Sequence, residues 1–217
     1  MLTFIAVPCM DMVPATFCQS ITTLQRVGNC RIAFQMGSLV YTSRNSLAAQ
    51  ALEQEADYIL WLDSDMVFNP DLLERMTETA KSLDADFVTG VYYRRVEPYT
   101  PVLFEKLELR EEGGSEWTHF NDFPDDTPFK VGGCGFGCVL MSTGVVMDVS
   151  NKFNGRLFHP LDGLGEDLSF CWRARQCGYE IYADPSIPLG HMGYTMIGRA
   201  HWKAYERQRM DNLLGRG

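Results

Sequence analysis

The stretch Tyr58-Ile-Leu-Trp-Leu-Asp-Ser-Asp-Met-Val-Phe68 is an apolar run that leads into two aspartates, Asp63 and Asp65. Such a run of aromatic and aliphatic residues is typical of a buried strand. In an open α/β sheet, ligands bind just beyond the carboxyl ends of the strands, and both aspartates would lie there. Two carboxylates at that edge can bind a divalent cation, which in turn can bind an anionic ligand. The stretch therefore predicts a ligand site at the end of one strand.

A second pair of aspartates has the same spacing but a different position. Asp84 and Asp86 precede the apolar run 87–91 instead of following one. They would lie at the amino end of a strand, away from the edge where ligands bind, so we interpret them as a solvent-exposed loop. For the first pair, the alternative is a polar turn in which Asn69 caps a helix that begins at Pro70.

Strand and helix patterns alternate through the first half of the chain. We expect strands at residues 1–8, 31–36, 58–62 and 87–91 and helices at 15–26, 43–56 (capped by Ser43) and 70–83. This order predicts an α/β fold with a mostly parallel, doubly wound sheet. In the less regular second half we expect a hairpin around 111–114, a short strand at 139–141, helices at 143–149 and 166–178, and a strand at 180–183.

The composition favours a single acidic domain. The 217 residues suffice for one large core, and no linker divides them, so we expect one domain, 1–217. The net charge of −9 argues against non-specific nucleic-acid binding as the main activity and leaves room only for a local basic groove. Seven cysteines without Cys-x-x-Cys pairs argue against a zinc site or a disulfide framework. Without a basic leader or a long apolar segment, we expect a cytoplasmic protein that has no integral membrane segment.

Two further patterns contain residues that suit a catalytic or metal site. Glu166 and Asp167 follow Gly165 in the first turn of a predicted helix, where acids also favour the helix dipole without any function. His191 follows Gly190 beyond a predicted strand. A lone histidine is usually structural, but one between glycines at such a position can reach a metal.

Taken in order, these motifs resemble those of GT-A glycosyltransferases of the family-2 kind. The resemblance spans the chain from Ile5 to Gly193. Small stand-alone members of this kind are similar to ones carried by phages and viruses. It implies a Rossmann-like, mostly parallel mixed sheet flanked by helices, a nucleotide-sugar donor and a hexosyltransferase-like activity. The motifs are Ser43-Arg-Asn45, the Asp-x-Asp strand end, Gly135-Phe-Gly137, Gly165-Glu-Asp167 and Gly190-His191.

The resemblance also implies a metal and its ligands. Asp63 would contact the ribose or a metal-bound water, Asp65 would ligate the metal directly, and His191 would be another ligand. Carboxylate, imidazole and phosphate oxygen together suit Mn²⁺, with Mg²⁺ as the substitute. The ion would bridge the diphosphate and offset the charge that develops as the nucleoside diphosphate leaves.

The remaining roles follow from the same resemblance. Asp167 would be the catalytic base of an inverting enzyme, and Glu166 would orient it or bind the acceptor. Pro8 and Asp11 would hold the nucleotide base, with a carboxylate accepting a hydrogen bond from uracil, which favours a UDP-sugar. Arg44 would contact the diphosphate or the acids, although a salt bridge at the helix start explains it as well. The retaining enzymes share several of these elements, so the stereochemistry stays open.

The expected division places the donor half at residues 1–95, the acceptor and metal half at 96–193, and a tail at 194–217. The tail is either a lid over the donor or, more simply, a basic solvated helix. The acceptor is open among a glycan, a protein, a lipid-linked sugar and a modified nucleic-acid base. The Gln-x-x-Arg-Trp motif of processive members is absent from the sequence, which argues against long polymer synthesis.

Three other interpretations compete. A sugar-1-phosphate nucleotidyltransferase needs a glycine-rich, basic loop after the first strand, and residues 8–14 contain neither Gly nor Lys. A dehydrogenase needs Gly-x-Gly-x-x-Gly spacing, which residues 132–137 lack. A binding module that lost turnover would have little need of an acid placed as a base. We therefore expect an enzyme.

Overall fold

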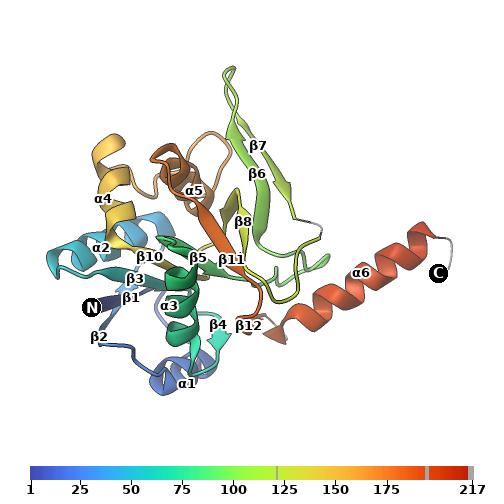
Figure 1. Cartoon of the computed structure of the whole chain (residues 1–217), viewed down its shortest axis with the longest axis horizontal. Helices are drawn as coiled ribbons and strands as arrows, with labels where there is room; N and C mark the ends of the chain where they lie inside the picture. Colours follow the sequence, from blue (N-terminus) through green and yellow to red (C-terminus); the bar gives the residue numbers. More distant parts are fainter. Residues whose placement is uncertain (121, 194–195, 215–217) are drawn as a thin grey trace.

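The apolar run before Asp63 forms strand β3 (Tyr58–Leu62), which lies inside a seven-stranded sheet (Figure 1). The computed structural model describes residues 1–120, 122–193 and 196–214. The strand order is β2-β1-β3-β10-β5-β11-β8. The other six strands are β1 (Leu2–Cys9), β2 (Asn29–Met36), β5 (Phe87–Gly90), β8 (Phe129–Val131), β10 (Cys138–Ser142) and β11 (Ile181–Asp184).

The direction of the strands is mixed. β1 pairs in parallel with both β2 and β3, and β5 pairs in parallel with β11. β10 lies between β3 and β5 and is antiparallel to both, so these two strands still run in the same direction. The alternating first half therefore forms the parallel arrangement that was predicted, and one strand from the second half is inserted into it.

Both faces of the central strands are buried, which explains why these strands are almost entirely apolar. Alternate residues of β3 belong to two separate cores: Ile59 and Trp61 to one, Leu60 and Leu62 to the other. Helices α2 (Val40–Glu53), α4 (Thr143–Lys152) and α5 (Glu166–Gln176) contribute to the first core, and α1 (Ala15–Thr23) and α3 (Leu72–Leu83) to the second. The two cores share one sheet, so the chain forms a single α/β domain.

Two predicted helix starts are displaced. The second helix begins at Val40 instead of Ser43, so Ser43 is not its N-cap but lies buried inside the first turns. The preceding residues extend the helix because Tyr41 packs against the core. The third helix begins at Leu72, two residues after Pro70.

The second half adds two small sheets. The predicted hairpin is formed by β6 (Leu103–Leu109) and β7 (Ser115–His119), and β9 (Gly133–Cys134) pairs with β6. In the other sheet β12 (Leu189–Met192) pairs with β4 (Met66–Phe68) and β13 (Met196–Ile197). The antiparallel register of β12 and β4 places His191 opposite Met66, one residue from Asp65. This sheet therefore joins two distant parts of the sequence at the predicted site.

The tail forms helix α6 (Arg199–Leu213), which extends away from the rest of the protein (Figure 1). Trp202 is its single buried residue and stacks on Tyr93, and most of the other side chains are exposed. This agrees with the solvated helix that was predicted, while residues 194–195 and 215–217 of the tail lie outside the described part. Within the described ranges, no helix combines the length and apolar character needed to cross a membrane.

Candidate functional site

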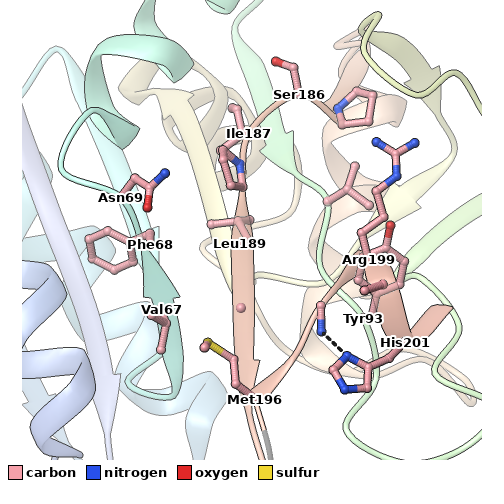
Figure 2. Close-up of a pocket in the computed structure, with 16 residues that line it drawn as sticks. Val67, Phe68, Asn69, Tyr93, Ser186, Ile187, Leu189, Met196, Arg199 and His201 are labelled. Atoms are coloured by element: carbon pink, nitrogen blue, oxygen red, sulfur yellow. Dashed lines mark hydrogen bonds between the residues drawn. The ribbon is translucent and has the colours of Figure 1, made fainter. Parts of the chain in front are cut away.

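An apolar pocket of about 520 Å³ lies beside β12, outside the predicted site (Figure 2). Phe68, Ile187, Leu189 and Met196 are among the side chains that line it. Its one cationic side chain from α6, Arg199, already pairs with Asp125. None of the predicted site residues lines this pocket, and its apolar lining does not suit a charged diphosphate.

A smaller, polar cavity of about 220 Å³ lies at the carboxyl ends of β1 and β3. It is formed by the loop after β1, the start of α2, the turn after β3 and the first turn of α5. The structure thus brings together five of the predicted residues, namely Pro8, Arg44, Asp63, Asp65 and Glu166. The cavity lies where an open α/β sheet is expected to bind a ligand.

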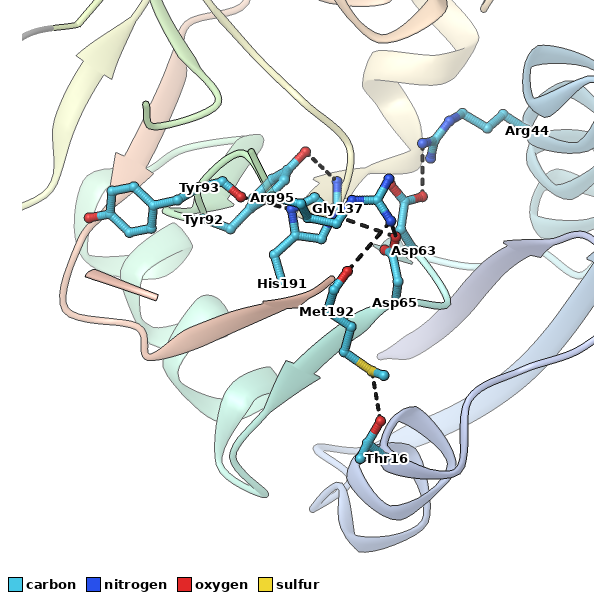
Figure 3. A network of polar contacts seen from close by, with 10 residues as sticks. All are labelled: Thr16, Arg44, Asp63, Asp65, Tyr92, Tyr93, Arg95, Gly137, His191 and Met192. Carbon is cyan, nitrogen blue, oxygen red and sulfur yellow. Dashed lines mark hydrogen bonds and ion pairs between the residues drawn. The ribbon is translucent and has the colours of Figure 1, made fainter. Parts of the chain in front are cut away.

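The two aspartates, Asp63 and Asp65, lie in the turn between β3 and β4, and backbone hydrogen bonds fix this turn (Figure 3). The Asp63 N–H donates to the Gly137 carbonyl at 3.1 Å, and the Met66 N–H donates to the Asp63 carbonyl at the same distance. The Met192 N–H donates to the Asp65 carbonyl at 2.8 Å. Since three elements fix this turn, both carboxylates project from a rigid position.

Arg44 is a buried cation that lines the polar cavity, with only 2% of its surface exposed. Its Nη2 donates to Asp63 Oδ1 at 2.9 Å, its Nε lies 3.7 Å from Glu166 Oε1, and the guanidinium covers the Phe136 ring. Burial lowers the pKa of Arg44, but the Asp63 and Glu166 carboxylates outweigh it, so the pKa is raised. Its Nε and Nη1 are buried and have no hydrogen-bond partner among the described residues. Buried charged donors without acceptors are costly, and an anionic ligand in the cavity would supply acceptors.

His191 and Asp65 lie close together, although only Asp65 lines the polar cavity (Figure 3). The His191 Nδ1 lies 2.7 Å from the Tyr93 carbonyl, and a carbonyl can only accept, so this nitrogen carries the proton. In the neutral ring Nε2 then has a lone pair, and it lies 3.5 Å from Asp65 Oδ2. Two electron-pair donors at this separation repel unless they share a positive charge, which is either a proton on Nε2 or a metal ion. A ring whose other nitrogen is fixed by a carbonyl is the usual form of a metal-ligating histidine.

Arg95 is a site residue that sequence reasoning missed. Its Nη1 donates to Asp65 Oδ2 at 2.8 Å and lies 3.5 Å from the Met192 carbonyl, although half of the side chain is exposed. Burial raises the pKa of Asp65, but His191 and Arg95 together hold it below its ordinary value. The available signal was a pair of arginines, Arg94 and Arg95, just beyond a buried strand.

Asp167 lies in the first turn of α5, next to Glu166. Its Oδ1 accepts a hydrogen bond from the Leu168 N–H at 2.7 Å. Burial and the neighbouring Glu166 raise the pKa of Asp167 to about 6, although the hydrogen bond and the Arg44 charge oppose the shift. A half-buried carboxyl with a pKa near neutrality has the protonation behaviour of a general base.

The remaining predicted residues are less closely assembled. Asp11 is exposed in the turn after β1, beside Met10, which lines the polar cavity. The second pair of aspartates lies where it was predicted. Asp84 and Asp86 are exposed, and they precede β5 instead of following it.

The described residues do not form a complete metal centre. Among them, no group of three or more His, Cys, Asp or Glu side chains could hold an ion. The Asp63 carboxylate is engaged by Arg44, which leaves Asp65 and His191 as the available pair. This composition fits a cation that takes its other ligands from water and from phosphate oxygens of a substrate, as Mg²⁺ commonly does.

The fold has counterparts among solved structures. The crystal structure of A197 from STIV matches with a TM-score of 0.62 and 19% sequence identity, over 89% of this chain and 86% of that one. A structure of GalNAc-T7 with UDP, GalNAc and Mn²⁺ matches with a TM-score of 0.60 and 8% identity, over 88% of this chain and 44% of that one. These likenesses confirm the predicted GT-A fold. A comparison with the curated protein sequences found no match.

Sequence comparison adds the family. Residues 35–145 match the family described as "Glycosyl transferase family 2", and this range is just over half of the chain. It contains Arg44, Asp63 and Asp65, which meet in the polar cavity. The cavity at the strand ends, the Asp-x-Asp turn and this match agree, and the chain belongs to glycosyl transferase family 2.

Proposed function

We propose that the protein is a metal-dependent glycosyltransferase that moves a sugar from a nucleotide-diphosphate sugar to an acceptor hydroxyl. The observation that carries the proposal is the approach of His191 Nε2 to Asp65 Oδ2 at 3.5 Å, with Nδ1 bonded to a carbonyl. This pair fits a divalent cation, with Mn²⁺ as first choice and Mg²⁺ as substitute. When bound, the ion supplies positive charge that stabilises the departing diphosphate.

The buried Arg44 is the second support. Arg44 lines the same cavity as Asp63 and Asp65, its Nε and Nη1 have no hydrogen-bond partner among the described residues, and a diphosphate would supply acceptors for them. The nucleoside would then lie along the loop of Pro8 and Asp11. UDP is our choice of nucleotide, on the family resemblance and the Asp11 carboxylate alone.

For the chemical step we propose inversion with Asp167 as the base. The acceptor oxygen attacks the anomeric carbon, the bond from that carbon to the diphosphate oxygen breaks, and its electron pair leaves with the nucleoside diphosphate. The acceptor proton passes to the Asp167 carboxylate, which Glu166 orients. A base of this kind contributes roughly 10² to 10⁴ in rate.

The proposal is tested by calorimetry of the protein with UDP, GDP, CDP and TDP, each with and without Mn²⁺. We expect one nucleotide to bind selectively, only with the metal, and the binding to disappear in Asp65→Ala. Asp86→Ala is the matched control, because Asp86 is an exposed aspartate outside the site and should leave binding unchanged. If no nucleotide binds, or if binding ignores the metal, the roles given to Asp63, Asp65 and His191 are wrong.

A further inference from the structure

Arg95 and a metal ion would compete for one oxygen atom. The Asp65 oxygen nearest to His191 Nε2 is Oδ2, and Arg95 Nη1 donates to that same oxygen at 2.8 Å. A metal shared by Asp65 and His191 would use this oxygen, and the positive guanidinium would oppose it by charge repulsion and by occupying one of the lone pairs of Oδ2. The geometry therefore sets metal binding and the Arg95–Asp65 pair against each other.

The side chain of Arg95 has room to move, whereas the chain just before it is anchored. The Arg94 N–H donates to the Thr100 carbonyl at 2.9 Å, and Tyr93 forms a bridge with Pro101, so the chain on the N-terminal side of Arg95 is anchored. The Arg95 side chain is 50% exposed and lies beside Asp65 (Figure 3). A displaced guanidinium would thus remain beside the metal and beside any diphosphate bound to it.

We propose that Arg95 is a further catalytic residue, which pairs with Asp65 until a metal–diphosphate complex enters and then pairs with the diphosphate. The inference rests on the proposed function. Breaking the bond to the sugar leaves additional negative charge on the diphosphate, and a planar guanidinium can donate two parallel hydrogen bonds to phosphate oxygens. The exchange costs little, since the ion pair that is lost is partly exposed to water and therefore weak.

The test uses two probes that do not depend on which nucleotide the protein binds. Binding of Mn²⁺ alone is measured by electron paramagnetic resonance, and binding of inorganic pyrophosphate at saturating Mn²⁺ is measured by calorimetry. In Arg95→Ala, Mn²⁺ alone should bind about fivefold more tightly, because its competitor is gone. Pyrophosphate should bind about tenfold more weakly, because a charge-assisted contact is lost. A residue with a merely structural role would not shift the two affinities in opposite directions.

Arg94→Ala is the matched control, because it removes the same charge one residue away. Burial and then the Arg94 charge lower the pKa of His119, so Arg94 acts on a different part of the protein. We expect this variant to bind both probes like the wild type, and Arg95→Lys to recover part of the pyrophosphate affinity. Thermal melting confirms that each variant is folded.

The outcomes separate the two proposals. If the wild type binds metal and pyrophosphate but Arg95→Ala binds Mn²⁺ no more tightly, or pyrophosphate no more weakly, the role of Arg95 is wrong and the metal site stands. If neither the wild type nor Arg95→Ala binds Mn²⁺ under any condition, the metal site itself is wrong, and the role of Arg95 with it.

Discussion

The Asp167 carboxyl has a pKa of about 6, which makes the proposed reaction sensitive to pH. The base must be ionised, so kcat/KM should rise about tenfold per pH unit below this value and level off above it. We expect Asp167→Asn to lower the rate by roughly 10² or more and to abolish this limb. Initial rates of donor hydrolysis between pH 5 and pH 8, taken at saturating metal, measure both effects. A wild-type profile without a limb near 6 would exclude Asp167 as the base.

The same carboxyl should reduce the stability of the fold when it is ionised. Its pKa in the folded protein exceeds the ordinary value of 3.8, so the protonated carboxyl favours the folded state. This stabilisation is complete below pH 3.8 and is lost as the pH rises through about 6. Asp167→Asn should therefore raise the free energy of unfolding at pH 8 by up to about 2 kcal/mol, and by little at pH 4. Urea denaturation at the two pH values measures the difference. Equal stability at pH 8 would contradict the pKa shift.

Arg44 should matter for stability as well as for binding. Arg44→Met leaves the Asp63 carboxylate without its partner, which should cost about 2 kcal/mol, below the value for a fully buried pair because Asp63 is 31% exposed. The control is Arg75→Ala, which breaks an exposed pair with Asp71 and should cost no more than about 1 kcal/mol. Urea denaturation of both variants compares them. Equal costs would mean that burial does not strengthen the Arg44 pair.

Among the elements, the loop before β10 controls the position of Asp63. The Gly137 N–H donates to the Tyr92 hydroxyl, and a Cβ added at Gly137 would lie 2.7 Å from the Tyr92 ring. Gly137→Ala must therefore shift this loop, whose carbonyl accepts from the Asp63 N–H. We expect metal-dependent nucleotide affinity to fall about tenfold or more in a folded protein.

Gly144→Ala is the control for that substitution, because a Cβ at this position in α4 would meet its neighbours only at 3.4 Å or more. It should preserve binding and stabilise α4 by roughly 0.5 to 1 kcal/mol. Calorimetry and thermal melting of both variants measure the two effects. Unchanged binding in Gly137→Ala would show that the loop does not position Asp63.

The long elements were predictable because each carries a pattern of its own. The runs in β1, β3 and β5 are almost entirely apolar since both faces of these strands are covered, and α3 has a regular apolar face. The insertion of β10 between β3 and β5 was not predictable, because it depends on a pairing between distant segments. The short strands β4, β12 and β13 span too few residues for any periodicity.

For the whole molecule, the extended α6 raises the question whether the tail acts as a lid. Trp202 attaches the start of the helix to Tyr93, whereas the residues after Tyr205 are almost all exposed. We expect truncation after Tyr205 to change the free energy of unfolding by no more than about 0.5 kcal/mol and to leave donor hydrolysis unchanged. Melting curves and rates of the truncated protein measure this. A marked change in rate would favour the lid.

The sequence by itself determined the strands β1, β3 and β5, the helices that cover them and the turn that carries Asp63 and Asp65 at the end of a strand. These features are local, since an apolar run followed by carboxylates indicates both the strand and its end. Only the tertiary structure decided that Arg95 and His191 meet at one oxygen of Asp65, and that Arg44 reaches Asp63 and Glu166 together. Those contacts depend on how β12 packs against β4 and α2 against β1. Packing between segments that are distant in the sequence produces no recognisable pattern of residue spacing.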